Sequence, residues 1–513
     1  MKKLDWFVAE EIPRTHFHLL EPVYEYWGKE MKKDIGMIID VLSVYRNGNV
    51  FFCWPRKQFS SAGKKTFEKT LKNPEWMIKI NFLLEKTAGK LIESSKKMEK
   101  KDFSVMTNKE LEKVFSSHMK IHFKCHALGM LATMIEWDHE LISNYLKNYL
   151  SQRISEKKLS LKVAETFSLL TTPLDESFQL KHEKEIIRIA LNVLNDEKTK
   201  KLFLENEPCK IIELLPLTNK KIGEELEANY RNFRWLPFMY IGPAWEKDYF
   251  IQQIKGLIKS GENLSLILEK MDNRINEVKR KQIELTEKLS VDEKHNKLFG
   301  ISRQMIYLKG LRKDSLYYSF FSYEPFLKEL GRRLGLSLNQ LRCMWPSEFK
   351  KAILKRDFDS NELNERFKFS VYACVDGKSK TLTGKKAEAY ARQAPDPKEY
   401  KISELEGSTA VPGMVKGTAK IINLPEDMNK MNQGDVLVSH ATNPNLVPAM
   451  KKASAIITDI GGVTCHAAIV SRELNIPCVI GTKIATKVIK DGDLLDVNAN
   501  HGIIKILKKE VKK

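Results

Sequence analysis

The chain has 513 residues, of which 42% are hydrophobic, 9% aromatic and 30% charged. This length and composition predict two to four globular domains of roughly 150 residues each and exclude a largely disordered or fibrous protein. Lys and Arg number 86 against 66 Asp and Glu, so the formal net charge is +20. The excess indicates anionic partners, although most lysines alternate with glutamates as on a solvated helix face.

No apolar run in the sequence approaches the length of about 20 residues that a membrane-spanning helix requires. Residues 1–14 include Asp and Glu where a signal peptide needs an apolar stretch. The seven cysteines are scattered, with no CxxC pair, which is typical of a reduced, cytoplasmic protein. Because no basic strand with interleaved aromatic residues occurs either, we expect no nucleic-acid partner and no membrane partner.

Residues 1–385 carry apolar side chains at helical spacing over most of their length, which predicts a mainly α-helical region. Two stretches differ. Residues 41–54 place β-branched and aromatic runs on either side of an Asn-Gly pair, which predicts a small β-hairpin. Residues 370–384 form a second hairpin-like stretch around an Asp-Gly pair.

Three histidines form one stripe of a predicted helix, because His118, His122 and His126 follow each other at intervals of four. Adjacent pairs have the spacing of a two-histidine metal site, but no HExxH glutamate accompanies them, so no metal site is predicted. The first interpretation is a polar stripe that faces a cleft or a neighbouring helix. The alternative is a substrate-binding role.

Arg332 and Arg333 stand side by side at the end of another helical stretch. A guanidinium group can bind a phosphate through two parallel hydrogen bonds, so this pair is a candidate for orienting a phosphorylated substrate. The simpler interpretation is a solvated helix end.

Residues 386–406 lose the apolar periodicity and contain an Ala-Pro-Asp-Pro sequence, which predicts a linker. In residues 407–513, short β-branched runs separated by Gly, Pro, Asn and Asp alternate with two helical patterns. That alternation predicts a compact α/β domain. The expected fold is therefore multidomain, with a helical region, a linker and an α/β domain in chain order.

The informative segment of this domain is AIITDIGGVTCHAAIVSRELNIPCVIGT, residues 455–482. A buried strand leads into a flexible turn at Gly461 and Gly462, and a helix follows with Thr464 as its expected N-cap. His466 then lies in the first helical turn, where free N–H groups and partial positive charge favour a phosphoryl group. A neutral imidazole at this place is a capable nucleophile.

This segment resembles the phosphohistidine signature of the PEP-utilising enzyme family, which includes phosphoenolpyruvate synthase, pyruvate phosphate dikinase and rifampicin phosphotransferase. Residues 407–422, 440–459 and 491–506 resemble the strands around the signature, so the resemblance covers residues 407–513. In that family this is a swivelling domain, and its loop histidine, matched here by His466, carries the phosphoryl group.

The residues around the carrier are candidates for binding the phosphoryl group. Gly461 and Gly462 allow close approach of an incoming phosphate donor, and the Thr464 hydroxyl is a candidate contact to the phosphoryl oxygens. Val463 departs from the synthases, which often carry Arg there, so an arginine contact is missing. Cys465 is interpreted as a small helix residue, since transfer through imidazole does not need a thiol.

Upstream, residues 5–24, the hairpin near Asn47 and Gly48, and residues 311–335 and 345–349 resemble the helical substrate domain of the same family. Because no ATP-grasp sequence precedes Asp5 and the chain ends seven residues after Ile506, we expect it to lack both the family's ATP-grasp module and its C-terminal barrel. The resemblance implies ATP with Mg²⁺ as the donor, bound on a separate ATP-grasp polypeptide, and a small-molecule acceptor at the helical domain.

The function implied is a dikinase-like phosphotransferase that moves a phosphoryl group from a nucleotide site through His466 to the acceptor. Two alternatives stay open. One is a non-catalytic or regulatory binding module with a vestigial histidine loop, and the other is a phosphorelay carrier phosphorylated by another protein. The intact loop favours the enzyme over the vestigial module.

Overall fold

The computed structural model describes residues 4–12, 15, 17, 21, 24–136, 140–394, 404–442, 444–459, 461, 465–482 and 484–509. The contacts divide the chain into two compact units. The first comprises Met1–Asn144, Leu308–Arg312 and Ser322–Lys513, and the second comprises Tyr145–Tyr307 and Lys313–Phe321. The helical region that was expected as one domain, residues 1–385, is thus divided between the two units. No helix in the described ranges is long and apolar enough to cross a membrane.

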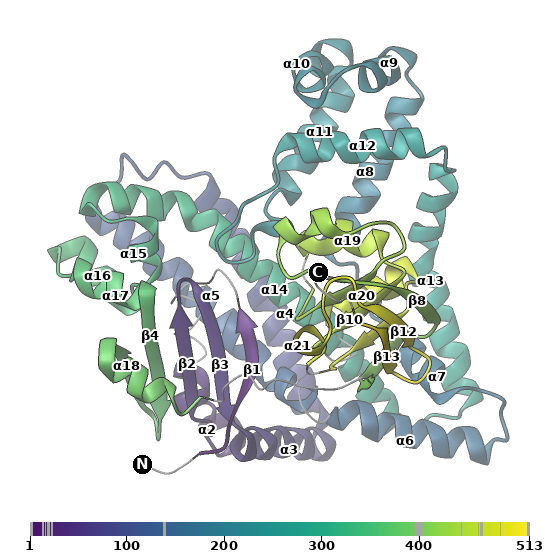
Figure 1. Ribbon diagram of the computed structural model, residues 1–513, viewed down its shortest axis with the longest axis horizontal. Coiled ribbons are helices and arrows are strands. Elements are labelled where there is room, and N and C mark those ends of the chain that lie inside the picture. Colours follow the sequence, from purple (N-terminus) through teal and green to yellow (C-terminus); the bar gives the residue numbers. More distant parts are fainter. Residues whose placement is uncertain are drawn as a thin grey trace. The chain divides into compact units, whose positions relative to one another are not determined.

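The first unit contains an antiparallel sheet of five strands in the order β1-β3-β2-β4-β5 (Figure 1). The strands are β1 (Trp6–Ile12), β2 (Val41–Arg46), β3 (Asn49–Pro55), β4 (Phe369–Val375) and β5 (Lys378–Thr383). Both expected hairpins form, and their turn residues Asn47, Gly48, Asp376 and Gly377 all have positive φ, as a type I′ turn requires. The two hairpins share one sheet because β2 pairs with β4.

Helices that belong to the same unit precede and follow the second unit in the sequence. They are α2 (Lys32–Ile35), α3 (Arg56–Lys72), α4 (Pro74–Glu99), α5 (Asn108–Glu136), α15 (Leu338–Arg342), α16 (Pro346–Lys355), α17 (Ser360–Lys368) and α18 (Gly384–Ala391). Phe115 of α5 stacks on Phe349 of α16, with ring centroids 4.6 Å apart. It also stacks on Phe326 of α14 (Glu293–Leu334) at 4.9 Å. These aromatic contacts help to form the core that fixes α5.

The regular secondary structure of the second unit is helical throughout its described residues. Its helices are α7 (Val163–Leu170), α8 (Phe178–Leu194), α9 (Glu197–Glu205), α10 (Pro208–Thr218), α11 (Lys220–Phe233), α12 (Lys247–Ser260) and α13 (Leu264–Lys288). α8 is its central helix and packs against α9, α11, α12 and α13. Two further helices, α6 (Leu141–Glu156) and α14, contribute residues to both units.

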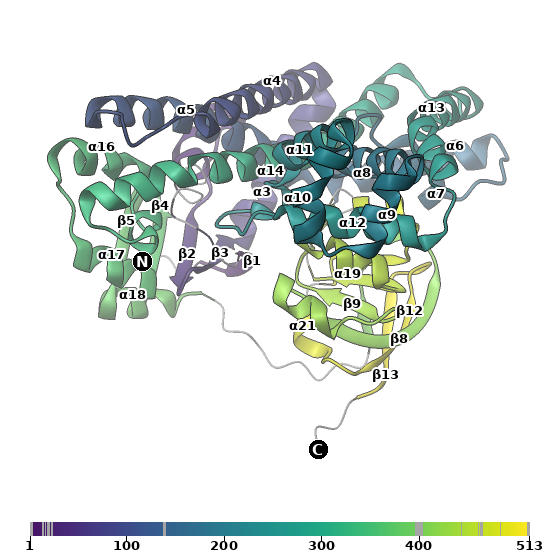
Figure 2. The same cartoon turned by 90° about the horizontal axis from the view of Figure 1, so that it is seen from above.

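The C-terminal part of the first unit forms a sheet of eight strands in the order β6-β13-β12-β8-β9-β10-β11-β7 (Figure 2). Its elements are β6 (Glu404–Glu406), β7 (Ser408–Val411), β8 (Met414–Ile421), β9 (Val436–Ser439), α19 (Val447–Lys452), β10 (Ala455–Thr458), α20 (His466–Leu474), β11 (Cys478–Ile480), α21 (Ala485–Val488), β12 (Leu494–Asn498) and β13 (Ile503–Lys508). The four strands β8 to β11 are parallel to one another, and the outer pairs are antiparallel.

Short helices cover this sheet. α20 packs on β7, β10 and β11, and α21 packs on β9 and β10. Ala485 and Val488 of α21 join a buried cluster with Val436, Val438 and Ile457 of the parallel strands. The expected fold class, a mainly α-helical N-terminal region followed by a compact α/β domain, is confirmed.

The stretch expected as a linker, residues 386–406, has regular structure at both ends. Helix α18 extends to Ala391, and strand β6 begins at Glu404. Residues 395–403 lie outside the described residues. The domain boundaries near residues 385 and 407 therefore stay predictions.

Candidate functional site

The parallel strands of the C-terminal sheet end at one edge, and the residues that follow them carry the polar groups of the candidate site. Strand β9 ends at Ser439 and is followed by His440 and Thr442, while β10 ends at Thr458 and is followed by Asp459. Ligands of open α/β sheets bind beyond the carboxyl ends of the parallel strands. The fold therefore places histidine, hydroxyl and carboxylate groups at the edge of the sheet where such folds bind their ligands.

His466 is the first residue of α20, as the sequence indicated. The N-cap is Cys465, whose Sγ accepts a hydrogen bond from the backbone N–H of Ala468 at 3.4 Å. The expectation that Thr464 caps the helix is thus wrong by one position, because the helix begins one residue later and a sulfur lone pair takes the place of the hydroxyl oxygen. Thr464 and Gly462 lie outside the described residues, so their phosphoryl-binding role stays a prediction.

Gly461 allows the loop to approach the start of the helix. Its φ is +131°, and a Cβ at this residue would lie 2.6 Å from Cys465 Sγ. A side chain is therefore excluded both by the backbone conformation and by the space available. Gly461 thus lies close to the helix cap within the chain, and its phosphoryl-binding role stays a prediction.

The ring of His466 is oriented by a hydroxyl group from another loop. Its Nδ1 lies 2.9 Å from Thr442 Oγ1, and Thr442 is only 7% exposed. When Nδ1–H donates to this oxygen, the lone pair of the neutral imidazole is on Nε2. The His466 side chain is half-buried at the helix N-terminus, where the helix dipole stabilises added negative charge.

A buried carboxylate lies at the same edge of the sheet. Asp459 is 1% exposed, and its Oδ1 accepts a hydrogen bond from the backbone N–H of Thr486 at 2.9 Å. Its Oδ2 accepts a second hydrogen bond from the Thr486 hydroxyl and faces Nδ1 of His440 at 3.2 Å. Three donors thus satisfy a carboxylate that would otherwise be costly to bury.

Sequence reasoning missed Thr442, His440 and Asp459 as members of the site. Each follows a short β-branched run, and polar residues directly after parallel strands are the signal that could have found them. Their pairing with particular partners depends on contacts across the sheet, which a single sequence does not reveal.

The histidine stripe lies on α5, and all three side chains are buried. Nδ1 of His118 is 2.8 Å from the hydroxyl oxygen of Ser94 on α4. Burial lowers the pKa of His118 to about 4, and burial followed by the Arg312 charge lowers that of His126. The His118 and His126 rings are therefore neutral near pH 7. This arrangement favours the interpretation of the stripe as a polar face toward a neighbouring helix, and substrate binding by His118, His122 and His126 stays a prediction.

The low pKa of His118 predicts a dependence of stability on pH. Because the folded state disfavours the proton, its contribution is complete above pH 6.5 and is lost as the pH falls to about 4. Replacement by asparagine should remove up to about 3 kcal/mol of this pH-dependent change. Urea unfolding at several pH values from 7 to 4 measures this change in the free energy of unfolding. The control is His501→Asn, at an exposed histidine. If the free energy of unfolding changed with pH equally in His118→Asn and wild type, the lowered pKa of His118 would be contradicted.

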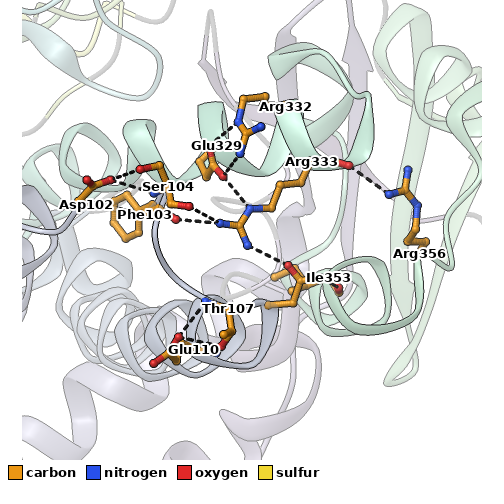
Figure 3. A network of polar contacts seen from close by, with 11 residues as sticks. Asp102, Phe103, Ser104, Thr107, Glu110, Glu329, Arg332, Arg333, Ile353 and Arg356 are labelled. Carbon is orange, nitrogen blue, oxygen red and sulfur yellow. Dashed lines mark hydrogen bonds and ion pairs between the residues drawn. The ribbon is translucent and has the colours of Figure 1, made fainter.

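Arg332 and Arg333 are engaged with protein groups (Figure 3). Nε of Arg333 donates to Glu329 Oε1 at 2.6 Å, and its Nη1 donates to Asn108 Oδ1 at 3.0 Å. Its Nη2 donates to the carbonyl oxygens of residues 103 and 104 at 3.0 and 3.1 Å. Arg333 thus fastens the loop between α4 and α5 to the end of α14. This supports a structural role, and substrate binding by either arginine stays a prediction.

Replacement of Arg333 by alanine should lower the free energy of unfolding by about 2 kcal/mol, because several hydrogen bonds to one charged group are lost together. Arg332 is the matched control. It is 67% exposed and bonds the same Glu329 carboxylate, so Arg332→Ala should cost clearly less than Arg333→Ala. Urea titration at pH 7 compares them, and equal losses would contradict the network.

The same network predicts that acid lowers the stability of the fold through Glu329. Hydrogen bonds from Arg332 and then Arg333 lower the pKa of Glu329 to about 2. Its stabilising contribution is therefore present above the ordinary pKa of 4.5 and is lost as the pH falls toward 2.

Within the described ranges, no group of three His, Cys, Asp or Glu side chains is arranged to hold a metal ion.

Comparison with known proteins places the C-terminal part in a family. A family model described as "PEP-utilising enzyme, mobile domain" matches residues 431–502. The probable phosphoenolpyruvate synthase of Archaeoglobus fulgidus is 52% identical over 109 residues, which are 21% of this chain and 14% of that protein. The phosphoenolpyruvate synthase of Pyrococcus furiosus is 47% identical over 137 residues, 26% of this chain and 17% of that protein.

The match thus spans less than a fifth of the length of these curated relatives. Among solved structures, the holo-form of Thermococcus kodakaraensis aconitase X is 20% identical over 20% of this chain and 98% of that chain, with a TM-score of only 0.17. The structure places a histidine at a helix N-terminus beside the ends of parallel strands, within the residues that match this family model. The chain contains a mobile domain of the PEP-utilising enzyme family.

Proposed function

We propose that this chain is a phosphotransferase component that carries a phosphoryl group on His466 from a nucleotide site to an acceptor at its helical region. The observation that supports this most is the 2.9 Å contact between Thr442 Oγ1 and Nδ1 of His466. With Nδ1–H donating to this hydroxyl, the neutral ring keeps its lone pair on Nε2, the proposed nucleophile, at the N-terminus of a helix inside the region that matches the family.

The chemistry follows from that geometry. The Nε2 lone pair of His466 forms a bond to phosphorus while the bond from phosphorus to the leaving oxygen breaks, and the leaving group keeps that electron pair. Thr442 holds the Nδ1 proton in place. The first amides of α20 stabilise the added charge. In the second transfer, a nucleophilic atom of the acceptor attacks phosphorus, and the N–P electron pair returns to Nε2.

We also propose that the donor is ATP, bound with Mg²⁺ by an ATP-grasp module on a separate polypeptide, and that the acceptor is a small molecule. The resemblance to the family supports the donor. The resemblance also places Mg²⁺ with the donor, where it would neutralise phosphate charge, and we derive no step of this chain from it.

The test is to incubate the chain with ATP labelled at the β-phosphate and a purified ATP-grasp protein. We expect label on the peptide that contains His466, and this label should be lost in acid but retained in base, as a phosphoramidate requires. A parallel reaction with phosphoramidate as a small donor removes the need for a partner. If only the reaction with phosphoramidate gave label, ATP as the donor would be contradicted but His466 as the phosphoryl carrier would not. Label that is stable in acid would contradict both proposals.

A further inference from the structure

The segment between His440 and Thr442 connects two polar contacts of the site. At one end, His440 Nδ1 lies 3.2 Å from Asp459 Oδ2. At the other end, Thr442 Oγ1 lies 2.9 Å from His466 Nδ1. Only one residue separates these two side chains in the sequence. The position of the His440 ring therefore constrains where the Thr442 hydroxyl can lie.

Hydrogen bonds from strand β9 and the chain after β8 hold this segment. The backbone N–H of His440 donates to Asn423 Oδ1 at 2.7 Å. The hydroxyl of Ser439 donates to the carbonyl oxygen of Ala441 at 3.1 Å and contacts the same Asn423 oxygen at 3.3 Å. The segment is thus fixed at its start and in its middle, which limits the freedom of Thr442.

The Asp459 carboxylate is a rigid anchor for the ring. Asp459 has a fully buried side chain, and Thr486 supplies two of its three donors. His440 supplies the third. Nε2 of His440 is buried and has no hydrogen-bond partner within the described ranges. The polar contact of this ring therefore runs through Nδ1.

We propose that His440 is a positioning residue for the carrier histidine: the Asp459 carboxylate holds its Nδ1–H, and this fixes Thr442 so that Nδ1 of His466 stays engaged and Nε2 stays the nucleophile. The inference rests on the proposed function, because it concerns the atom of His466 that takes the phosphoryl group. Loss of the anchor releases Thr442, and His466 then loses its fixed tautomer.

The test measures the rate and the site of phosphorylation on the full chain with phosphoramidate as donor. In ³¹P NMR the two isomers of phosphohistidine are distinct, so the attacking nitrogen is read directly. In wild type we expect the Nε2 isomer. In His440→Ala we expect the rate at His466 to fall about 10- to 100-fold, with part of the product on Nδ1. A residue that only stabilised the fold would change the yield but not the isomer.

Two further variants separate the ring nitrogens. The amide N–H of asparagine takes the place of Nδ1–H, so His440→Asn should retain the wild-type rate and isomer. Glutamine places its amide nearer the position of Nε2, so His440→Gln should behave like His440→Ala. His501→Ala, an exposed histidine of the same domain, should match wild type, and Thr442→Val should reproduce the loss.

Each other outcome overturns the inference. His440→Ala at the wild-type rate with only the Nε2 isomer would show that Thr442 needs no anchor. Rescue by glutamine and not by asparagine would place the role on Nε2. Circular dichroism reports folding, and unfolding of both the alanine and the asparagine variants would make His440 a residue of the domain core. Failure of wild type itself to be phosphorylated would instead contradict the proposed function.

Discussion

His466→Ala should reduce phosphorylation of the chain by at least about 10³-fold, because no other group replaces the nucleophile. His466 is half-buried and is the first residue of α20. Its removal leaves the Cys465 cap in place. The free energy of unfolding should therefore change by less than about 1 kcal/mol. Radiolabel incorporation and urea unfolding measure the two quantities on the same preparation.

Cys465→Ser is the matched control for this variant. A serine oxygen can accept the hydrogen bond from the Ala468 N–H that the sulfur accepts now. We expect label within a few-fold of wild type, since the thiol takes no part in the transfer. Full label in His466→Ala, or loss of label in Cys465→Ser, would assign the nucleophile to the wrong residue.

Gly461→Ala should have the second largest effect. The new Cβ would lie 2.6 Å from Cys465 Sγ and 2.8 Å from Cys465 Cβ, and the φ of +131° is one that alanine rarely adopts. The loop must move away from the helix cap. Since a displacement of about 1 Å can cost 10²-fold in rate, phosphorylation of His466 should fall by about that factor. The free energy of unfolding should also fall, by about 1–3 kcal/mol.

Gly434→Ala separates displacement of the loop at the helix cap from a general loss of domain stability. Gly434 also has positive φ, +89°, but a Cβ there has nothing within 4 Å. It precedes β9, at the amino end of the parallel strands. We expect a loss of stability of about 1 kcal/mol and a wild-type labelling rate. An equal loss of label in both glycine variants would show that domain stability, and not the loop at the cap, controls transfer.

The sequence predicts the parts of the site that depend on local pattern. The two glycines, the histidine and the apolar run after it are contiguous, so the loop-helix junction at His466 follows from residues 455–482 alone. Capping is also local, but Thr464 and Cys465 can both cap, and helix ends are uncertain by one residue. The choice of Cys465 is therefore known only from the structure.

Contacts between distant segments were not predictable in the same way. Thr442 and His466 are 24 residues apart and meet because β9 and β10 are adjacent parallel strands. The pairing of β2 with β4 also joins two hairpins from opposite ends of the helical region. One hydrophobic pattern is compatible with several strand partners, so a single sequence gives each hairpin but not the sheet that unites them.

The identity of the phosphorylated atom is tested most directly by ³¹P NMR of the wild-type chain after reaction with phosphoramidate, recorded in alkaline solution with His466→Ala beside it. We predict one phosphohistidine resonance from Nε2 of His466, absent in the variant, because Thr442 occupies Nδ1. A resonance from the Nδ1 isomer of His466 would contradict Nε2 as the phosphorylated atom. A phosphohistidine signal that persists in His466→Ala, or no phosphohistidine at all, would contradict His466 as the phosphocarrier.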